Sequence, residues 1–189
     1  RGSMAETTLD RAAAEAIAGG WHGDPFGVLG PHKAEKGWEV VAFVPGADRL
    51  WLLTGKTEAE GEAYPGIPGL FTHRLARKAN YRFRAEGHGN VWEFEDPYRF
   101  GPVLGEMDEY LLGEGTHRRL WQVLGAHCIT HEGVDGVHFA VWAPNARRVS
   151  VVGAFNLWDG RRHVWNHFKP LSRVLGFEIT NHADHQGEE

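Results

Sequence analysis

One unit of sequence occurs twice in this chain, with an offset of 99 residues between the copies. Residues 37–50 read G-W-E-V-V-A-F-V-P-G-A-D-R-L, and residues 136–149 read G-V-H-F-A-V-W-A-P-N-A-R-R-V. Glycine, proline, alanine and arginine coincide in the two copies, and Phe43 aligns with Trp142. Each copy combines an apolar strand, a Pro-x-Ala turn and a second strand. The repeat therefore predicts a mainly β chain with two tandem modules of the immunoglobulin-like β-sandwich type.

The segments around the repeat predict a division of the chain into four parts. Residues 1–29 would hold the remnant of a cloning tag, a short helix and an ordered loop rich in Gly and Pro. Residues 30–97 would form the first β-sandwich, and residues 98–134 a linker with short helices. Residues 135–189 would form the second β-sandwich.

Local patterns predict several elements inside these parts. Alanine-rich residues 8–18 predict a helix that two following glycines end. Residues 87–90, with the sequence G-H-G-N between two alternating runs, predict a β-hairpin. Residues 108–112 and 117–124 predict two linker helices, the second with Thr116 as its N-cap.

Composition narrows the classes of partner and compartment. The 189 residues carry a formal charge of −5 with both signs interspersed and no basic stripe, so nucleic acid is not an expected partner. No apolar run approaches the roughly 20 residues needed to cross a membrane. The single cysteine, Cys128, cannot form an intramolecular disulfide, which favours a reducing compartment such as the cytoplasm.

Residues 136–160 carry a family resemblance. They read G-V-H-F-A-V-W-A-P-N-A-R-R-V-S-V-V-G-A-F-N-L-W-D-G, and this segment is very similar to the glucan-binding module that precedes the barrel in 1,4-α-glucan (glycogen) branching enzymes. Residues 24–32, 96–102 and 113–117 resemble the same family in order and spacing. The motif around residue 144 alone would also fit isoamylases and trehalose-forming hydrolases, and the added first module favours branching enzymes.

Two departures from the family pattern concern the second module. The family usually shows Gly-Asp-Phe-Asn where this chain has Gly153-Ala154-Phe155-Asn156. After His163, residues 164–175 match no family segment, whereas residues 177–179 resemble a later strand. The second module is therefore expected to be incomplete or rearranged.

The resemblance implies that the parent enzyme catalyses a retaining transglycosylation. That chemistry uses two carboxyl groups about 5 Å apart. In the family they lie on a (β/α)₈ barrel, a fold of about 250 residues. The acidic clusters at residues 93–96 and 106–109 are interpreted as solvated surface. This chain alone is therefore expected not to catalyse, and no catalytic residue or cofactor is assigned.

Histidines raise the question of a metal site. His127 and Cys128 with His131, and His163 with His167, have superficially suitable spacings. These residues lie in a strand or loop context, where such spacings do not converge as they do on a helix. No metal ligand is assigned.

Trp158 and Asn156 are the predicted glucan-binding residues. An exposed indole offers a flat apolar face to a glucose ring, and an amide offers hydrogen bonds to hydroxyls. Related modules use a Trp at this motif position, so the resemblance implies an α-1,4-glucan partner such as glycogen or a maltooligosaccharide. The alternative is that Trp158 packs on its own sandwich or on the parent's catalytic barrel. The modules would then be structural and bind no sugar.

The other tryptophans are interpreted mainly as core. Trp142 and Phe43 occupy equivalent strand positions in the repeat, and Trp38, Trp51 and Trp92 also lie on predicted strands. Trp21 lies in a less regular segment and could be exposed.

Overall fold

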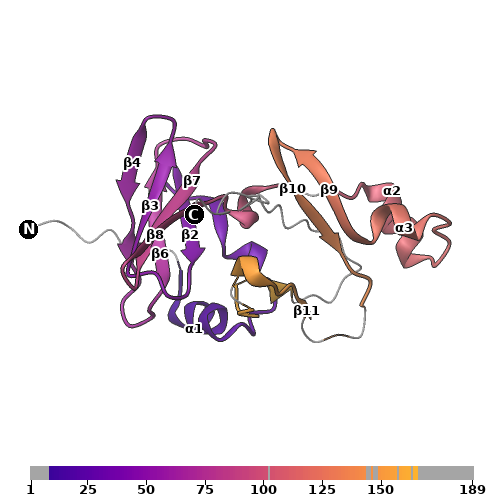
Figure 1. Cartoon of the computed structure of the whole chain (residues 1–189), viewed down its shortest axis with the longest axis horizontal. Helices are drawn as coiled ribbons and strands as arrows, with labels where there is room; N and C mark the ends of the chain where they lie inside the picture. The colour runs from indigo at the N-terminus through magenta and orange to yellow at the C-terminus, as the bar shows by residue number, and fades with distance from the viewer. Residues whose placement is uncertain are drawn as a thin grey trace, which may run out of the picture.

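The computed structural model describes residues 9–101, 103–143, 146, 149–156, 158–162 and 164–165. The first half of the chain forms two four-stranded antiparallel sheets packed face to face (Figure 1). One sheet has the order β1-β2-β6-β5, with β1 at Gly30–Lys33, β2 at Trp38–Phe43, β6 at Leu70–Leu75 and β5 at Glu62–Ala63. The other has the order β4-β3-β7-β8, with β4 at Thr57–Glu60, β3 at Arg49–Thr54, β7 at Arg82–Gly87 and β8 at Asn90–Phe94. The predicted mainly β fold with a first sandwich is confirmed.

The Pro-x-Ala turn of the first repeat connects the two sheets. β2 lies in one sheet and β3 in the other, so the chain changes layers at this turn. Gly46 adopts a left-handed φ of 87°, and the Ala47 N–H donates to the Val44 carbonyl at 3.1 Å. The first copy of the repeated unit is therefore a sandwich corner rather than a hairpin.

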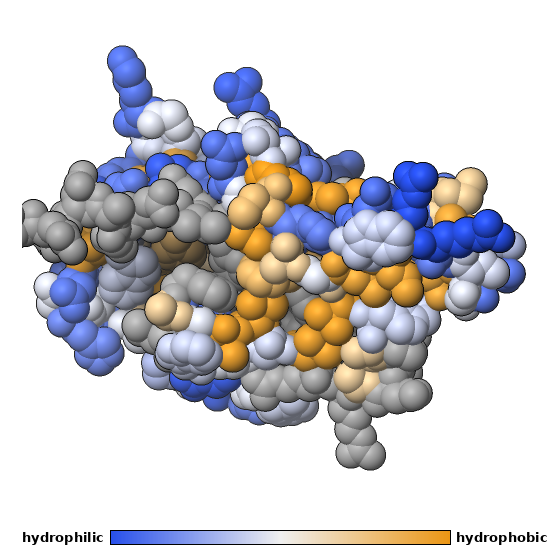
Figure 2. All heavy atoms as spheres, turned by 45° about the vertical axis from the view of Figure 1, so that its right-hand side comes forward, coloured by the Kyte–Doolittle hydropathy of each residue, from blue (hydrophilic) through white to orange (hydrophobic). Residues whose placement is uncertain are grey.

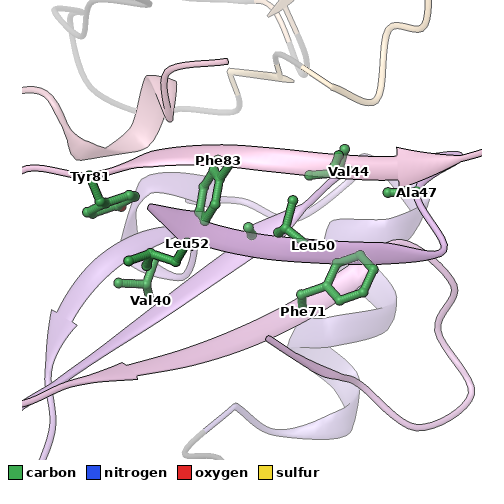
Figure 3. Close-up of a cluster of buried hydrophobic side chains, with 10 residues drawn as sticks. Val40, Val44, Ala47, Leu50, Leu52, Phe71, Tyr81 and Phe83 are labelled. Atoms are coloured by element: carbon green, nitrogen blue, oxygen red, sulfur yellow. The ribbon is translucent and has the colours of Figure 1, made fainter. Parts of the chain in front are cut away.

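Alternating side chains from both sheets fill the space between them (Figure 3). Leu50, Leu52 and Phe83 are almost fully buried there. The Phe83 ring lies 5.3 Å from the Tyr81 ring and 5.6 Å from the Phe94 ring, measured between centroids. Burial of each such large side chain stabilises the fold by about 2 kcal/mol.

A third layer covers the outer face of the β2 sheet. Helix α1 at Arg11–Gly19 packs its buried Ala14 and Ile17 against Val41 and Leu70. This second contact explains why the middle of β2 is buried on both faces. The predicted N-terminal helix is confirmed, but it begins at Arg11 rather than at residue 8. Asp10 is its N-cap, because the Asp10 carboxylate accepts from the Ala13 N–H at 2.9 Å.

The predicted hairpin at residues 87–90 is also confirmed. β7 and β8 pair antiparallel, with Gly87 opposite Asn90. The two turn residues between them, His88 and Gly89, both have positive φ, at 52° and 78°. This is the combination that a type I′ turn requires, and glycine reaches it without strain.

The linker contains two helices as predicted, but the boundaries of both are shifted. After the short helix η2 at Pro97–Arg99, α2 spans Glu106–Gly113 and α3 spans Leu120–Val123. The second helix is therefore shorter than expected, and its N-cap is Arg119 rather than Thr116. The Thr116 N–H instead donates to the Leu111 carbonyl at the end of α2.

A second β region follows α3. β9 at Gly125–His131 pairs with β10 at Val134–Ala140, and β11 at Val149–Ser150 pairs with β12 at Val164–Trp165. β9 lies within residues 98–134, where the sequence predicted a linker, and so precedes residue 135, the expected start of the second module. The division into modules stays a prediction, and so does the incompleteness of the second one.

Two predictions concern residues outside the described part of the chain. They are the tag remnant at residues 1–3 and the atypical tail after His163, apart from residues 164–165. Within the described ranges, no helix is long and apolar enough to cross a membrane.

Candidate functional site

Trp158 lies on a tight loop that follows β11. The short helix η3 at Ala154–Asn156 begins the loop, and the Trp158 N–H donates to the Gly153 carbonyl at 3.0 Å. Trp158 has a left-handed φ of 59°, which is strained for a bulky side chain. Its side chain is 71% exposed, so its own sandwich does not cover it. The loop thus holds a large indole in solvent in an unfavourable backbone conformation.

Asn156 holds this loop together from inside. Its side chain is 1% exposed. Its Oδ1 accepts from the Gly153 N–H at 2.9 Å, and its Nδ2 donates to the Val151 carbonyl at 2.8 Å. Both the oxygen and the nitrogen of the Asn156 amide are therefore hydrogen-bonded to the backbone. The expected direct contact of this amide with sugar hydroxyls does not fit that geometry. The Asn156 side chain therefore holds the backbone of the loop on which Trp158 lies.

The end of the loop carries a bidentate ion pair. The Arg161 guanidinium contacts both Asp159 carboxylate oxygens, with Nε at 2.9 Å and Nη2 at 2.7 Å. Hydrogen bonding to Arg161 lowers the pKa of Asp159 below its usual value, and the same bond raises the pKa of Arg161. The Ser150 hydroxyl donates to the Gly160 carbonyl at 2.8 Å and closes the loop onto β11. The loop is therefore fixed by its own side chains.

Arg162 and Tyr98 connect the loop to the first sandwich. The Arg162 guanidinium donates to the Pro45 carbonyl at the sandwich corner. The Tyr98 hydroxyl donates to the Arg162 carbonyl at 3.4 Å. In Figure 1 the loop, drawn in orange to yellow, accordingly lies beside α1 and the sandwich. The loop that carries Trp158 is thus hydrogen-bonded through Arg162 to Pro45 and Tyr98.

The structure corrects several expectations for the other aromatic residues. Trp142 is exposed rather than core, and Trp51 is half-buried on the outer face of its sheet between Arg49 and Arg84. Trp92 packs against the sandwich core as expected. Trp21 is exposed, which the sequence had left open.

Part of the first acidic cluster is buried, not solvated. The Asp96 carboxylate accepts from the Tyr81 hydroxyl at 2.5 Å and from the Tyr98 N–H at 2.9 Å. Burial raises the pKa of Asp96 to about 6. The neighbouring Glu95 pairs with Arg99 at 2.7 Å and with Arg82 at 3.0 Å. These contacts give both carboxylates a structural role in the junction between β8 and η2.

The two histidines of β9 make backbone contacts. His127 Nε2 lies 2.8 Å from the Leu124 carbonyl oxygen, and His131 Nε2 lies 3.1 Å from that of Gly101. Cys128 is free and exposed. Among the described residues, no three or more His, Cys, Asp or Glu side chains form a group that could hold a metal ion. The pair of His163 and His167 lies outside those residues.

The fold and the exposed loop together describe a mainly β chain whose second β region presents a solvent-exposed indole. Residues 123–186 match the model of carbohydrate-binding module 48, the isoamylase N-terminal domain. Residues 10–98 match the model of the N-terminal domain of the alpha-1,4-glucan branching enzyme GlgB.

Relatives agree with both models. The chain is 52% identical over 162 residues to the 1,4-alpha-glucan branching enzyme GlgB of Roseobacter denitrificans. It is 50% identical over 180 residues to that of Mesorhizobium japonicum and 49% identical over 159 residues to that of Agrobacterium fabrum. These matches cover 82%, 87% and 82% of this chain but only 22%, 24% and 22% of the relatives.

The chain therefore belongs to the GlgB branching-enzyme family and corresponds to its N-terminal, non-catalytic region. It spans less than a quarter of the length of these relatives.

Proposed function

We propose that this chain is the glucan-binding region of a 1,4-α-glucan branching enzyme, with Trp158 as its sugar-contacting side chain. The full enzyme would form α-1,6 branches in glycogen, and this region would hold a linear α-1,4-glucan near the catalytic barrel. The observation that carries the proposal is the exposed indole of Trp158 on a strained loop that buried hydrogen bonds maintain.

The physical reason lies in the match between an indole and a glucose unit. A glucose ring presents C–H groups on its faces and hydroxyls at its edge. A flat aromatic ring covers the apolar face, while its N–H can donate at the edge. Because Asn156 fixes the loop before a ligand arrives, little conformational entropy is lost on binding. A single platform of this kind is expected to bind in the millimolar range, about −4 kcal/mol.

We also propose that the parent enzyme works in the cytoplasm. The single cysteine is a free, exposed thiol, which suits a reducing environment. The proposal includes neither nucleic acid nor a membrane as partner, since the charge is −5 without a basic stripe.

The test compares two equally exposed tryptophans. Trp121 on α3 is 68% exposed, close to the 71% of Trp158. We expect maltoheptaose to bind the wild type saturably in ligand-observed NMR titrations. Trp158→Ala should weaken binding about tenfold or more, a loss of about 1.4 kcal/mol. Trp121→Ala should leave the Kd within twofold. Equal affinity of the wild type and Trp158→Ala would refute the proposal.

A second candidate function is docking, and one specific observation favours it. The linker helices expose four large apolar side chains, namely Met107, Tyr110, Leu120 and Trp121. Figure 2 brings the side with α2, α3 and the β9–β10 hairpin forward, and hydrophobic residues reach the surface across the middle of this face. Clustered exposed apolar side chains usually mark an interface. The catalytic barrel of the same parent enzyme is the partner that this candidate proposes.

The docking candidate makes its own prediction. The isolated chain should self-associate with rising concentration in analytical ultracentrifugation, because the apolar face lacks its partner. Trp121→Glu should abolish this association, whereas Val91→Glu, at an equally exposed apolar position on β8, should not. A wild-type chain that stays monomeric at high concentration would count against docking through this face. Sugar binding and docking use different residues, so the two candidates can be tested independently.

A further inference from the structure

One face of the β9–β10 hairpin is rich in histidine and packs against the preceding linker. Side chains alternate along a strand, so His127 and His131 of β9 share this face, and His138 of β10 lies directly opposite His127. Ala140, two residues after His138, lies on the same face and is buried. The linker side chains packed against this face are Phe100, Leu104 and Leu112. Three imidazoles therefore lie at the junction between the hairpin and the linker.

His138 is the most deeply buried of the three, at 3% exposed. Its ring centroid lies 6.2 Å from that of His127. In the part of the chain that the structure describes, its buried Nε2 has no hydrogen-bond partner. Burial lowers the pKa of His138, and the neighbouring His127 and His131 lower it further. A protonated His138 would be a buried cation beside two other imidazoles, which is unfavourable.

His127 and His131 already use one ring nitrogen each for a backbone contact. Nε2 of His127 donates to the Leu124 carbonyl at 2.8 Å, and Nε2 of His131 donates to the Gly101 carbonyl at 3.1 Å. Because a carbonyl can only accept, both rings carry their hydrogen on Nε2, and an added proton goes to Nδ1. Acid therefore preserves these two bonds but adds positive charge to the packed face.

The charged groups around this face have partners of their own. Glu132, in the hairpin turn, accepts from the Gly101 N–H at 2.9 Å and lies 3.6 Å from His131 Nε2. On the linker side the charged pairs are Asp108 with His117, and Glu95 with Arg99, whose guanidinium stacks on Phe100. The titratable groups that act on His138 itself are His127 and His131.

The first module contains the same strand pair with a different residue at the critical position. His32 occupies the place of His127, since its Nε2 lies 3.0 Å from the Leu29 carbonyl oxygen in an equivalent Leu-Gly-x-His segment. Opposite His32 lies Glu39, which is 4% exposed and precedes His138 by the 99 residues of the repeat. A protonated imidazole thus lies opposite a carboxylate in the first copy and opposite a second imidazole in the second copy.

We propose that the opposed histidines make the β9–β10 hairpin an acid-sensitive element, which mild acid releases from the linker without the same effect on β1 and β2. Neutral imidazoles allow the hairpin to pack at pH 7. As the pH falls below about 6.5, the released hairpin binds protons that the packed hairpin excludes, so stability is full above this range and is lost below it. This device does not depend on sugar binding by Trp158.

The test measures amide hydrogen-exchange protection factors in β9 and β10 at pH 7 and pH 5.5, with the full 189-residue chain. Protection factors already correct for the effect of pH on exchange from an unfolded chain. Exclusion of one proton should lower wild-type protection about tenfold over this range. His138→Glu recreates the pair of the first module, and His138→Gln removes the titrating ring without adding a charge. Both variants should change less than about twofold.

His32→Gln is the matched control, because it removes the equivalent histidine from the first module and should leave the hairpin response as in the wild type. Wild-type protection that is the same at both pH values would overturn the inference. An equal fall in the wild type, His138→Glu and His138→Gln would also overturn it, since the response would then come from other groups. A wild-type fall that both variants abolish supports it, whether or not the chain binds glucan.

Discussion

The two β regions of this chain share a sequence unit but differ in how they bury it. The first copy contributes one strand to each of two packed sheets and has α1 on its outer face, with two separate apolar clusters. In the described part of the second region, the buried apolar cluster contains only Leu104, Leu112 and Ala140, flanked by Val123 and Leu124. The comparison teaches that a repeated strand–turn–strand pattern specifies local structure, whereas stability depends on what covers its faces.

The two regions also differ in what stabilises them. The first module has the interior of a self-sufficient fold and provides a firm base. The second carries its indole on a loop held by polar contacts, two of which reach Pro45 and Tyr98. A binding side chain needs a fixed support more than it needs a large core of its own.

The largest expected effect concerns the two cores. Leu52→Ala removes a side chain from the centre of the first sandwich and should lower its free energy of unfolding by about 4 kcal/mol. Leu112→Ala, the same change in the smaller cluster, should cost about 2 kcal/mol. Urea unfolding followed by circular dichroism measures both. Equal losses in the two variants would contradict the conclusion that the first region has the more stabilising core.

The next effect is the pH dependence of the first module. Burial lowers the pKa of His73 to about 4 from the ordinary value of 6.5. The unfolded state then takes up a proton more readily than the folded state, so stability is full above pH 6.5 and falls as the pH drops towards 4. The loss attributable to His73 is about 3 kcal/mol.

The His73 contribution can be isolated by substitution. The raised pKa of Asp96 acts in the opposite direction, because its stabilisation is present at low pH and is lost as the pH rises through about 6. The wild type and His73→Leu should therefore be compared at each pH. Their difference in unfolding free energy should change by about 3 kcal/mol between pH 7 and pH 4. A constant difference would refute this account of His73.

A smaller effect is expected in the Trp158 loop. Asn156→Ala removes two buried hydrogen bonds and should destabilise the loop by about 2 kcal/mol. Amide hydrogen exchange at Gly153 and Trp158 should accelerate, while exchange in β2 stays unchanged. Asn90→Ala, which alters an exposed amide in the β7–β8 turn, is the control. Unchanged protection in Asn156→Ala would show that other contacts maintain the loop.

The smallest effect concerns the helical layer found on the first module. Asp10→Ala removes the N-cap of α1 and should cost about 1 kcal/mol. Asp10→Asn retains a capping oxygen and should be close to neutral. Thermal unfolding compares the three chains. A loss in Asp10→Asn as large as that in Asp10→Ala would mean that charge, not capping, is what α1 needs.

Sequence patterns predicted the elements that local rules determine. The β7–β8 hairpin follows from its G-H-G-N turn, and α1 follows from its alanines and the glycines after them. The mainly β class follows from the repeat. The exposure of Trp142 and the burial of Asn156 were not predicted, since both depend on which segments cover them in three dimensions.

One signal in the sequence would have improved the account of the second region. Leu29-Gly30-x-His32 recurs as Leu124-Gly125-x-His127. In both copies the glycine has positive φ, and the His Nε2 lies near the preceding Leu carbonyl oxygen, at 3.0 and 2.8 Å. Gly30 pairs with Val41 and Gly125 with Ala140, which are equivalent positions of the main repeat. This second repeat predicts a strand at Gly125, where the linker was expected.

The central claim is that the indole of residue 158 meets the sugar. The eight tryptophans give eight indole N–H signals, which heteronuclear NMR resolves during titration with maltoheptaose. The account predicts that the Trp158 signal shifts saturably, with the Trp121 signal unchanged. A saturable shift at other indoles with the Trp158 signal unmoved would contradict it.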